Sequence, residues 1–382
     1  MTDARESRAV TRIVVVSLEP WDDVWRRNQY LVDGMLVADP GLEVLFVEPA
    51  ADPLFALSTG KRVQKGRGLR TAVGYGGRLR LFQPTKTLPR RLGRIADDLV
   101  TAGIRRAVSR LGWRDGVLWI NDPGQADLVA EFGWPSIYDM TDDWVEADRG
   151  VREHDRIADG DARLLRGCDE VVVCSVGLQR TKGRTRDVHL IPNAVDVSRY
   201  RRPASRPTDL PDGPVALYAG TLHEDRLDVG LVERTADAVP GTVFLLGPDA
   251  LTPENSARLS AHPHVVLAGA KSHDQVPSYL QHAHALIVPH VVDDFTESLD
   301  PLKLYEYHAV GRPTVSTAVA GFRDAPWVTV ATSAEFPAAV ADRLHHWEPS
   351  APGADVPDWS HRVSEFEEIV RTLQARVDGR IP

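Results

Sequence analysis

Short apolar, β-branched runs alternate with longer amphipathic stretches along nearly the whole chain. This alternation predicts parallel strands covered by helices. In the first half of the chain, the predicted strands are residues 12–17, 43–48, 117–120, 136–139 and 170–175. In the second half, they are residues 215–220, 242–247, 264–269, 285–290 and 313–317. The pattern therefore predicts an α/β fold with two doubly wound parallel sheets of similar size.

Two further patterns set the expected domain boundaries. Residues 191–214 lie between the two sets of strands and are rich in Pro, Arg and Asp, which indicates an interdomain linker. Residues 359–377 carry apolar side chains at helical spacing and predict a final amphipathic helix. We expect an N-terminal domain over residues 1–195, a C-terminal domain over 196–355, and a helix within 356–382 that packs back on the N-terminal domain. Doubly wound sheets bind ligands beyond the carboxyl ends of their strands, so the cleft between the domains is the expected site.

The composition is that of a water-soluble globular protein. Of the 382 residues, 43% are hydrophobic and 26% are charged. The longest apolar runs are the length of a strand, far below the roughly 20 residues that a membrane-spanning helix needs. The chain has only two cysteines, Cys168 and Cys174, and its start does not resemble a secretory signal. We therefore expect a cytoplasmic protein.

The net charge of −9 is unevenly distributed. Between Lys61 and Arg114 there are fifteen lysines and arginines, and only Asp97 and Asp98 oppose them. This basic segment is either a solvated face or a surface for an anionic partner, such as lipid headgroups or a phosphorylated acceptor. Peripheral contact with the inner face of the plasma membrane is one expectation. Nucleic acid is not an expected partner, because the rest of the chain is acidic and carries no nucleic-acid motif.

The most informative stretch is residues 298–317, Ser-Leu-Asp-Pro-Leu-Lys-Leu-Tyr-Glu-Tyr-His-Ala-Val-Gly-Arg-Pro-Thr-Val-Ser-Thr. Asp300 is a good N-cap, Pro301 suits the first helical position, and Gly311 is a typical helix end. The sequence therefore predicts a helix over residues 301–310. Its free backbone N–H groups and its dipole would face the cleft, which makes its start a place for phosphate.

Lys303 and Glu306 are three residues apart on the same face of this predicted helix. The ammonium group can neutralise a diphosphate, and the carboxylate can accept hydrogen bonds from a ribose. The alternative is a surface ion pair that stabilises the helix. Lys303 is one of only six lysines beside 39 arginines, a bias typical of a GC-rich bacterial genome, and it stands between two leucines. The composition therefore favours a binding role.

The Lys-x-x-Glu-x-x-x-x-Gly-x-Pro pattern at residues 303–313 resembles the nucleotide-sugar segment of the GT-B glycosyltransferases. Residues 191–196, Ile-Pro-Asn-Ala-Val-Asp, are similar to the stretch that begins their domain linker. Residues 218–222 and 245–248 resemble the glycine-containing strand ends of their donor domain. Within this superfamily, the chain looks most like cell-envelope enzymes of the TuaH and GumK type.

This resemblance implies a GT-B fold, in which two Rossmann-like domains face a central cleft. It also implies transfer of a sugar from a nucleoside-diphosphate donor to a hydroxyl group on a small-molecule, glycan or lipid-linked acceptor, with neither a cofactor nor a metal ion. The C-terminal domain would hold the donor through Gly220, Thr221, His290, Asp300, Pro301, Leu302, Lys303 and Glu306.

The resemblance also bears on stereochemistry. Retaining members of the large GT4 family usually carry an acidic residue eight positions before the ribose glutamate. Counting back from Glu306 gives Ser298, while Glu297 and Asp300 are out of register. We therefore expect an inverting enzyme, which needs a general base near the acceptor.

The N-terminal domain should supply this base. A histidine near the first strand is not available for this role, because the chain has no histidine before His154. An acidic segment, Tyr-Asp-Met-Thr-Asp-Asp-Trp at residues 138–144, follows a predicted strand and resembles the Asp-Asp segment of GumK-like enzymes. We favour Asp143 as the base, then Asp142, and assign Asp139 a structural role. The alternative is an acidic helix N-terminus without catalytic function.

The stretch after the first strand, residues 17–29, is rich in Trp and Arg. Aromatic rings can stack on sugars and guanidinium groups can bind phosphate. The predicted acceptor-binding residues are therefore Trp21, Arg26, Arg27, Gln29 and Trp144. The tryptophans could instead pack against the core. Two other functions share the predicted nucleotide pocket, namely a UDP-sugar 2-epimerase-like isomerase and a non-catalytic nucleotide-sugar binder.

Overall fold

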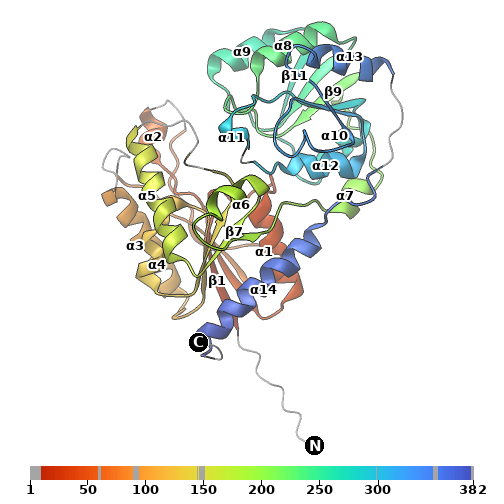
Figure 1. Cartoon of the computed structure of the whole chain (residues 1–382). Helices are drawn as coiled ribbons and strands as arrows, with labels where there is room; N and C mark the ends of the chain where they lie inside the picture. Colours follow the sequence, from red (N-terminus) through yellow and green to blue (C-terminus); the bar gives the residue numbers. More distant parts are fainter. Residues whose placement is uncertain are drawn as a thin grey trace, which may run out of the picture.

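The computed structural model describes residues 10–58, 62–88, 94–143, 145, 151–297, 299–346 and 352–379. The chain forms two α/β domains joined side by side, each with a central sheet covered by helices (Figure 1). All strands of the first sheet lie before residue 195, and all strands of the second lie after residue 214.

The first sheet has the strand order β3-β4-β2-β1-β5-β6-β7-β8, and only β3 runs antiparallel to its neighbour. Its strands are β1 (Thr11–Val16), β2 (Leu42–Val47), β3 (Gly68–Thr71), β4 (Leu79–Gln83), β5 (Val117–Ile120), β6 (Ser136–Met140), β7 (Glu170–Val173) and β8 (His189–Leu190). Successive residues of a strand point to opposite faces. In β1, Ile13 and Val15 therefore enter one apolar core, and Val14 and Val16 enter the other.

Helices cover both faces of this first sheet. They are α1 (Arg27–Ala38), α2 (Pro53–Ser58), α3 (Arg94–Arg110), the 3₁₀ turn η2 (Pro123–Gln125), α4 (Asp127–Phe132), α5 (Val151–Gly167) and α6 (Val176–Lys182). A short helix, α7 (Val197–Arg201), follows β8 and leads towards the second domain.

The second sheet is wholly parallel, with the order β11-β10-β9-β12-β13-β14. Its strands are β9 (Val215–Ala219), β10 (Thr242–Leu246), β11 (Val265–Gly269), β12 (Ala285–Val288), β13 (Thr314–Ser316) and β14 (Val328–Val330). Its helices are α8 (Val229–Ala238), α9 (Pro253–Ala261), α10 (Val276–His282), α11 (Asp294–Glu297), α12 (Leu302–Val310) and α13 (Phe336–His345).

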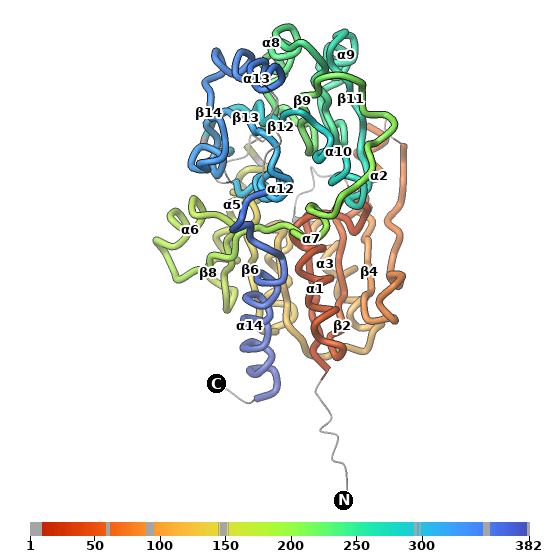
Figure 2. Tube along the Cα trace, turned by 90° about the vertical axis from the view of Figure 1, so that its right-hand side faces the viewer, coloured from red at the N-terminus to blue at the C-terminus, as the bar shows by residue number. Residues whose placement is uncertain are grey.

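The last helix, α14 (Trp359–Val377), lies against α1 and β5 of the first domain (Figure 2). Its ring side chains carry much of this packing. Trp359 stacks on Tyr30 with ring centroids 4.9 Å apart, and Phe366 lies 4.3 Å from Trp119. The chain therefore passes between the domains a second time. At this second crossing, Asp358 forms a parallel β-bridge with Val195, which belongs to the segment where the chain first crosses between the domains.

The ten strands expected from the sequence are all present, and their ends differ from the prediction by at most two residues. Four strands were not predicted: β3, β4, β8 and β14. Three of these, β3, β8 and β14, are short edge strands, and β4, which lies beside an edge strand, interrupts its apolar residues with Arg80. Among the helices of the described residues, none is long and apolar enough to cross a bilayer.

Candidate functional site

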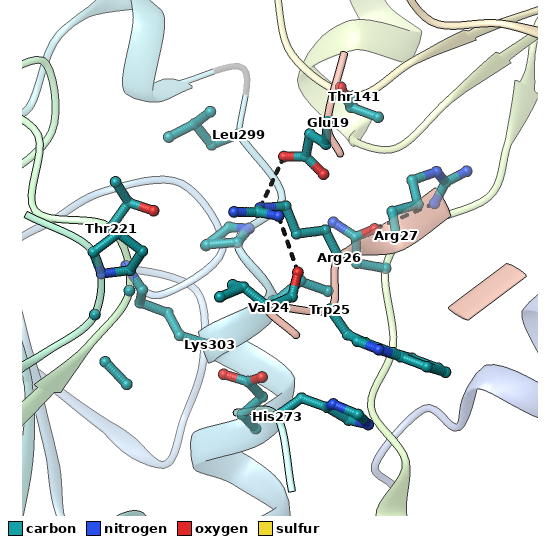
Figure 3. A pocket seen from close by; sticks show the side chains of 18 of the residues that line it. Glu19, Val24, Trp25, Arg26, Arg27, Thr141, Thr221, His273, Leu299 and Lys303 are labelled. Carbon is teal, nitrogen blue, oxygen red and sulfur yellow. Dashed lines mark hydrogen bonds and ion pairs between the residues drawn. The ribbon is translucent and has the colours of Figure 1, made fainter. Parts of the chain in front are cut away.

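A cavity of about 840 Å³ lies between the two domains, beyond the carboxyl ends of their parallel strands. The N-terminal domain contributes the loops that follow β1 and β6. The C-terminal domain contributes the loops that follow β9, β10 and β12 and the start of α12. Figure 3 draws Glu19 and Arg26 on one side of this cavity and Thr221 and Lys303 on the other. We call the side formed by the N-terminal domain the acceptor wall and the side formed by the C-terminal domain the donor wall, after the ligands predicted for them from the sequence.

All of the residues predicted from the sequence to bind the donor line this cavity: Gly220, Thr221, His290, Asp300, Pro301, Leu302, Lys303 and Glu306. The helix that carries the last of them, α12, begins at Leu302 and ends where Gly311 adopts a left-handed conformation, with φ of 72°. Glycine tolerates this backbone conformation without strain. The two ends of the helix therefore follow from its sequence almost as predicted.

One detail of the predicted helix start was wrong. Pro301, not Asp300, occupies the N-cap position of α12, and no side chain caps the helix. The Asp300 carboxylate instead accepts hydrogen bonds from the Asn193 backbone N–H at 2.5 Å and from the Tyr305 hydroxyl at 2.7 Å. Asp300 thereby ties the interdomain segment to α12. Because no side chain caps α12, its N-terminal end is open to an anionic ligand, although the Leu304 N–H already donates to the Pro301 carbonyl at 2.9 Å.

Lys303 is held among neutral groups. Its Nζ donates to the Tyr218 hydroxyl at 2.9 Å, lies 3.3 Å from His290 Nε2, and sits 4.2 Å from the centre of the Tyr218 ring. Burial and the nearby Arg226 lower the pKa of Lys303 to about 7, although Glu306 opposes the shift. Burial also lowers the pKa of His290 well below its usual value, so this imidazole is neutral. A bound anion would restore the charge of the ammonium group.

Two glycines shape the backbone next to Lys303. Gly220 has φ of 145°, and a side-chain carbon there would stand 3.0 Å from Lys303 Nζ. Gly247 has φ of 151°, and a side-chain carbon there would stand 2.0 Å from the Gly220 carbonyl oxygen. Both positions therefore need glycine, for conformation and for space. Because neither glycine has a side chain, the backbone at Gly220 lies close to the Lys303 ammonium group.

Glu306 lies one helical turn beyond Lys303 and also lines the cavity. Its carboxylate accepts a hydrogen bond of 2.6 Å from the Tyr200 hydroxyl. Burial raises its pKa, which the Tyr200 hydrogen bond and Lys303 partly offset. A carboxylate in this setting suits neutral hydrogen-bond donors such as sugar hydroxyls.

The two aspartates predicted as candidate bases, Asp142 and Asp143, differ in their position relative to the cavity. Asp142 lines the cavity, 3.8 Å from Arg226 of the other domain, and burial raises its pKa to about 6. Asp143 is buried and does not line the cavity. It pairs with Lys182 at 3.2 Å, and Lys182 also contacts Asp161 at 3.3 Å. Of the two predicted bases, therefore, only Asp142 lines the cavity.

A second acidic residue of the acceptor wall, Glu19, was not identified from the sequence. It follows β1, lines the cavity and lies 3.2 Å from Arg26 Nε. Removal from water inside the cavity raises its pKa to about 7, against the opposing effect of Arg26. The feature of the sequence that could have identified Glu19 is its position just after a predicted parallel strand, because ligands bind beyond the ends of such strands. Arg226, which faces Asp142, was also missed, because it follows a strand by several residues and belongs to no motif.

The residues predicted to bind an acceptor fare differently. Arg26 and Arg27 line the cavity, but Arg27 is buried and pairs with Asp139 at 3.1 Å. Trp21 does not line it and packs edge-on against Phe46, with ring centroids 5.1 Å apart. Gln29 is also absent from the lining, since its side chain accepts from the Arg26 N–H in a capping box.

The last predicted acceptor residue, Trp144, lies outside the described residues. Asp139 has the structural role expected of it. It is wholly buried, and besides Arg27 it accepts hydrogen bonds from Trp119 and Asn121, each at 3.2 Å. Of the Trp and Arg residues in the stretch 17–29, Trp25, Arg26 and Arg27 line the cavity, whereas Trp21 packs against the core.

The two walls touch at the rim of the cavity. The Trp25 ring stacks on His273 of the C-terminal domain, with centroids 4.4 Å apart, and the His273 backbone N–H donates to the Asp23 carbonyl at 2.9 Å. With the Arg226–Asp142 pair, these contacts hold the domains together around the cavity. A ligand here would meet groups of both domains.

Comparison with known proteins shows what this chain is similar to. Residues 213–346 match the family described as Glycosyl transferases group 1. A stretch of 218 residues is 27% identical to TuaH of Bacillus subtilis (strain 168), a protein assigned to teichuronic acid biosynthesis as a glycosyltransferase. That stretch spans about half of each protein, 52% of this chain and 55% of TuaH.

Solved structures match over nearly the whole chain. HepE of Anabaena, in complex with UDP and glucose, aligns with a TM-score of 0.59 and 13% identity over 97% of this chain and 99% of its own. The catalytic domain of starch synthase IV from Arabidopsis thaliana, bound to ADP and acarbose, aligns with a TM-score of 0.62 and 10% identity over 95% and 99%. The chain thus has the GT-B fold, and its predicted resemblance to the GT-B glycosyltransferases and to TuaH is confirmed.

Proposed function

We propose that this chain is a glycosyltransferase that moves a sugar from a nucleoside-diphosphate donor to the hydroxyl group of an acceptor. One arrangement carries the proposal: Lys303, at the start of α12, lies across a single cavity from the Asp142 carboxylate. A cation at a helix N-terminus suits a diphosphate, and a carboxylate suits a hydroxyl group that must lose its proton. The match to the group 1 glycosyltransferases covers the donor wall and supports the same assignment.

In this proposal, the donor binds along the C-terminal domain. Its diphosphate meets the first N–H groups of α12 and the Lys303 ammonium group, and the Gly220–Thr221 turn lets the phosphates approach the backbone. The ribose hydroxyls donate to Glu306. Transfer builds negative charge on the leaving diphosphate, and Lys303 stabilises that charge where it develops.

The acceptor hydroxyl gives its proton to Asp142 as its oxygen bonds to the anomeric carbon of the sugar. The bond between that carbon and the diphosphate oxygen breaks, and the electron pair leaves with the diphosphate. Because the base and the leaving group lie on opposite walls, attack from the opposite face inverts the anomeric configuration. The non-acidic Ser298 in the sequence agrees with an inverting reaction.

We assign this step no metal ion and no cofactor. The charge that a cation would neutralise on the leaving group is met by Lys303 and by the N-terminal end of the α12 dipole. Substrate binding would also strengthen this charge pairing, since an adjacent anion raises the pKa of a lysine that burial has lowered.

We further propose that the acceptor is a small molecule, a glycan or a lipid-linked sugar of cell-envelope assembly. The similarity to TuaH favours this class. Glu19 and Arg26 offer one carboxylate and one guanidinium group on the acceptor wall, so they would orient hydroxyl and anionic groups of the acceptor.

The experiment begins with a thermal-shift panel of UDP, GDP, dTDP and ADP on the full chain. We expect one nucleoside diphosphate to raise the unfolding temperature more than the others. Sugars linked to that nucleotide are then incubated with glycan and lipid-linked acceptors, and the expected result is release of the free diphosphate with a new glycosidic bond. An altered sugar formed without any acceptor would instead identify an isomerase. Tight binding with no conversion of any donor would identify a binding protein.

A further inference from the structure

Tyr218 and His290 line the cavity beside Lys303, but neither takes part in the proposed reaction. Both come from the middle of the second sheet, since Tyr218 belongs to β9 and His290 follows the neighbouring strand β12. The two residues are 0% and 3% exposed, so they present little surface to a ligand. Their polar atoms instead contact Lys303, which is the residue expected to meet the diphosphate.

The sheet holds these two residues in fixed places. Strand β9, which carries Tyr218, pairs with β10 on one side and with β12 on the other. His290 forms an antiparallel bridge with Leu227, and its carbonyl accepts a hydrogen bond of 2.8 Å from the Thr317 hydroxyl. A lysine side chain, by contrast, is a flexible stem of four carbons. Fixed acceptors at the end of that stem therefore decide where the Lys303 ammonium group points.

The three side chains form a hydrogen-bonded chain. Lys303 Nζ donates to the Tyr218 hydroxyl oxygen at 2.9 Å, and that hydroxyl lies 3.1 Å from His290 Nε2. A ring nitrogen of a neutral imidazole that carries no proton accepts a hydrogen bond. When His290 accepts the proton of the Tyr218 hydroxyl, a lone pair of the hydroxyl oxygen faces Lys303. The Tyr218 ring adds an attraction for the ammonium group, since its centre lies 4.2 Å from Nζ.

The protonation states of both partners suit this chain. Burial raises the pKa of Tyr218 and lowers the pKa of His290 well below its usual value, so both groups are neutral near pH 7. A protonated imidazole would only donate, and it would place a second positive charge 3.3 Å from Lys303 Nζ. Two charged groups also act on Lys303: Arg226 opposes its positive charge, and Glu306 favours it. Tyr218 and His290 therefore serve as neutral acceptors between these charges.

The chain leaves the ammonium group able to bind a ligand. An ammonium group has three N–H bonds, so one remains even when Tyr218 and His290 each accept one. The neighbouring residue, Gly220, has no side chain to fill this place. A side-chain carbon there would stand 3.0 Å from Lys303 Nζ and 3.3 Å from the Tyr218 hydroxyl oxygen. Because Lys303 lines the cavity, the remaining N–H can reach a phosphate oxygen.

We propose that Tyr218 and His290 are positioning residues: their hydrogen bonds keep the Lys303 ammonium group charged and directed at the diphosphate, and they do not bind the donor themselves. His290, predicted from the sequence as a donor-binding residue, then acts through Lys303 instead. The identity of the ligand rests on the proposed function. The effect of both residues on Lys303 needs no ligand and can be measured separately.

The first test observes Lys303 in the free protein by NMR. The chain has only six lysines, so ¹³C-labelled lysine gives few signals, and the signal missing in Lys303→Arg identifies Lys303. Tyr218→Phe keeps the ring and removes only the hydroxyl. We expect the midpoint of the Lys303 titration to move to lower pH by about one pH unit, because the ammonium group loses an acceptor. In the matched control Tyr75→Phe, which loses a hydrogen bond of 2.7 Å to Asp33 in the other domain, the midpoint should stay unchanged.

The second test measures the affinity for the preferred nucleoside diphosphate by isothermal titration from pH 6 to pH 8.5. A lower pKa of Lys303 in Tyr218→Phe matters little at pH 6, where the group is largely charged in both proteins, and most above pH 7. We expect a loss of affinity of about twofold at pH 6 that grows to about tenfold at pH 8.5. Titration of the nucleotide phosphates is common to both proteins and cancels in the ratio. A hydroxyl that only stabilised the fold would give the same loss at every pH.

Two substitutions test His290 in the same measurements. His290→Gln keeps a hydrogen-bond acceptor at a similar reach, so the affinity should stay within about twofold of wild type. His290→Leu removes the acceptor and should move the Lys303 midpoint in the same direction as Tyr218→Phe. Thermal unfolding shows whether each variant is folded.

Three results would overturn the proposal. The first is an unchanged Lys303 midpoint in folded Tyr218→Phe, and the second is a loss of affinity in that variant that is equal at every pH. The third is a loss of nucleotide binding in His290→Gln with an unchanged Lys303 midpoint, since His290 would then contact the donor itself. Wild-type protein that bound no nucleoside diphosphate would contradict the proposed function, and the NMR titrations alone would then decide whether Tyr218 and His290 hold Lys303.

Discussion

The two walls of the cavity are built in different ways. On the donor wall, Asp300, Lys303 and Glu306 come from one contiguous segment, residues 300–306, at the start of α12. The acceptor wall takes Glu19 and Asp142 from loops more than a hundred residues apart, and the fold brings them together. One wall is thus encoded locally, while the other depends on the order of the strands in the sheet.

Their electrostatics differ as well. On the donor wall, Lys303 contacts neutral groups, and burial lowers its pKa to about 7. On the acceptor wall, Glu19 and Asp142 each lie near an arginine, yet burial still raises their pKa values to about 7 and about 6. Both walls therefore hold groups whose charge a substrate can change. The donor wall is suited to an anion, and the acceptor wall to a group that loses a proton.

The largest expected effect separates the walls by function. Asp142→Asn should lower turnover by about 10²–10⁴-fold, because the acceptor hydroxyl loses its general base. It should leave nucleotide affinity unchanged, since Asp142 lies on the acceptor wall. Steady-state rates and calorimetric titration with the preferred nucleoside diphosphate measure the two effects.

Asp143→Asn is the control for this variant. Asp143 pairs with Lys182 outside the cavity lining, so its loss should lower stability and leave turnover close to that of wild type. If Asp142→Asn retained full activity, or if only Asp143→Asn lost it, the assignment of the base would be wrong.

The next effect concerns the support behind the acceptor wall. Asp139→Ala should lower the free energy of unfolding by about 3–5 kcal/mol, because it leaves the buried Arg27 without its carboxylate. Asp115→Ala, which removes an exposed partner of Arg12, should cost about 0–1 kcal/mol. Urea unfolding of both variants tests this. Equal losses would mean that Asp139 does not support the wall as described.

This contrast explains which parts of the molecule the sequence could predict. Ten strands, the helix at residues 301–310 and the terminal helix follow from local periodicity and from punctuation by Gly and Pro. The eight residues predicted to bind the donor all line the cavity, and five of them belong to one segment, residues 300–306, that resembles a known pattern. Asp300 was given the wrong local role, since its partner Asn193 lies about a hundred residues away.

The acceptor wall could be predicted only in part. The acidic segment at residues 138–144 was recognised, but composition cannot show which aspartate points into a cavity and which one pairs with Lys182. Trp21 and Gln29 have side chains suited to an acceptor, yet core packing and helix capping use them. Glu19 was passed over because a single glutamate in a loop carries no pattern of its own.

A smaller effect is expected on the donor wall. Lys303→Met should weaken binding of the preferred nucleoside diphosphate by about 10–100-fold, the usual range for a hydrogen bond to a charged group. Lys65→Met removes an exposed lysine outside the cavity and should leave the affinity unchanged. Isothermal titration measures both. An unchanged affinity in Lys303→Met would place the diphosphate elsewhere.

The smallest expected effect is the uptake of a proton when the diphosphate binds. With a pKa of about 7, Lys303 is mostly neutral at pH 8 in the free protein, and a bound diphosphate favours its charged form. Binding at pH 8 should therefore take up close to one proton, and affinity should fall as the pH rises above 7. Titrations in buffers of different ionisation enthalpy measure this uptake. In Lys303→Arg the side chain is always charged, so the uptake should vanish.

The central claim is that a diphosphate binds at the start of α12 opposite a carboxylate of the other domain. The most direct measurement is a crystal structure with the nucleoside diphosphate that gives the largest thermal shift. We predict that its phosphate oxygens lie within hydrogen-bonding distance of Lys303 Nζ and of the first N–H groups of α12, with Asp142 across the cavity. A diphosphate bound beside Arg26 on the acceptor wall, or anywhere outside this cavity, would contradict the account.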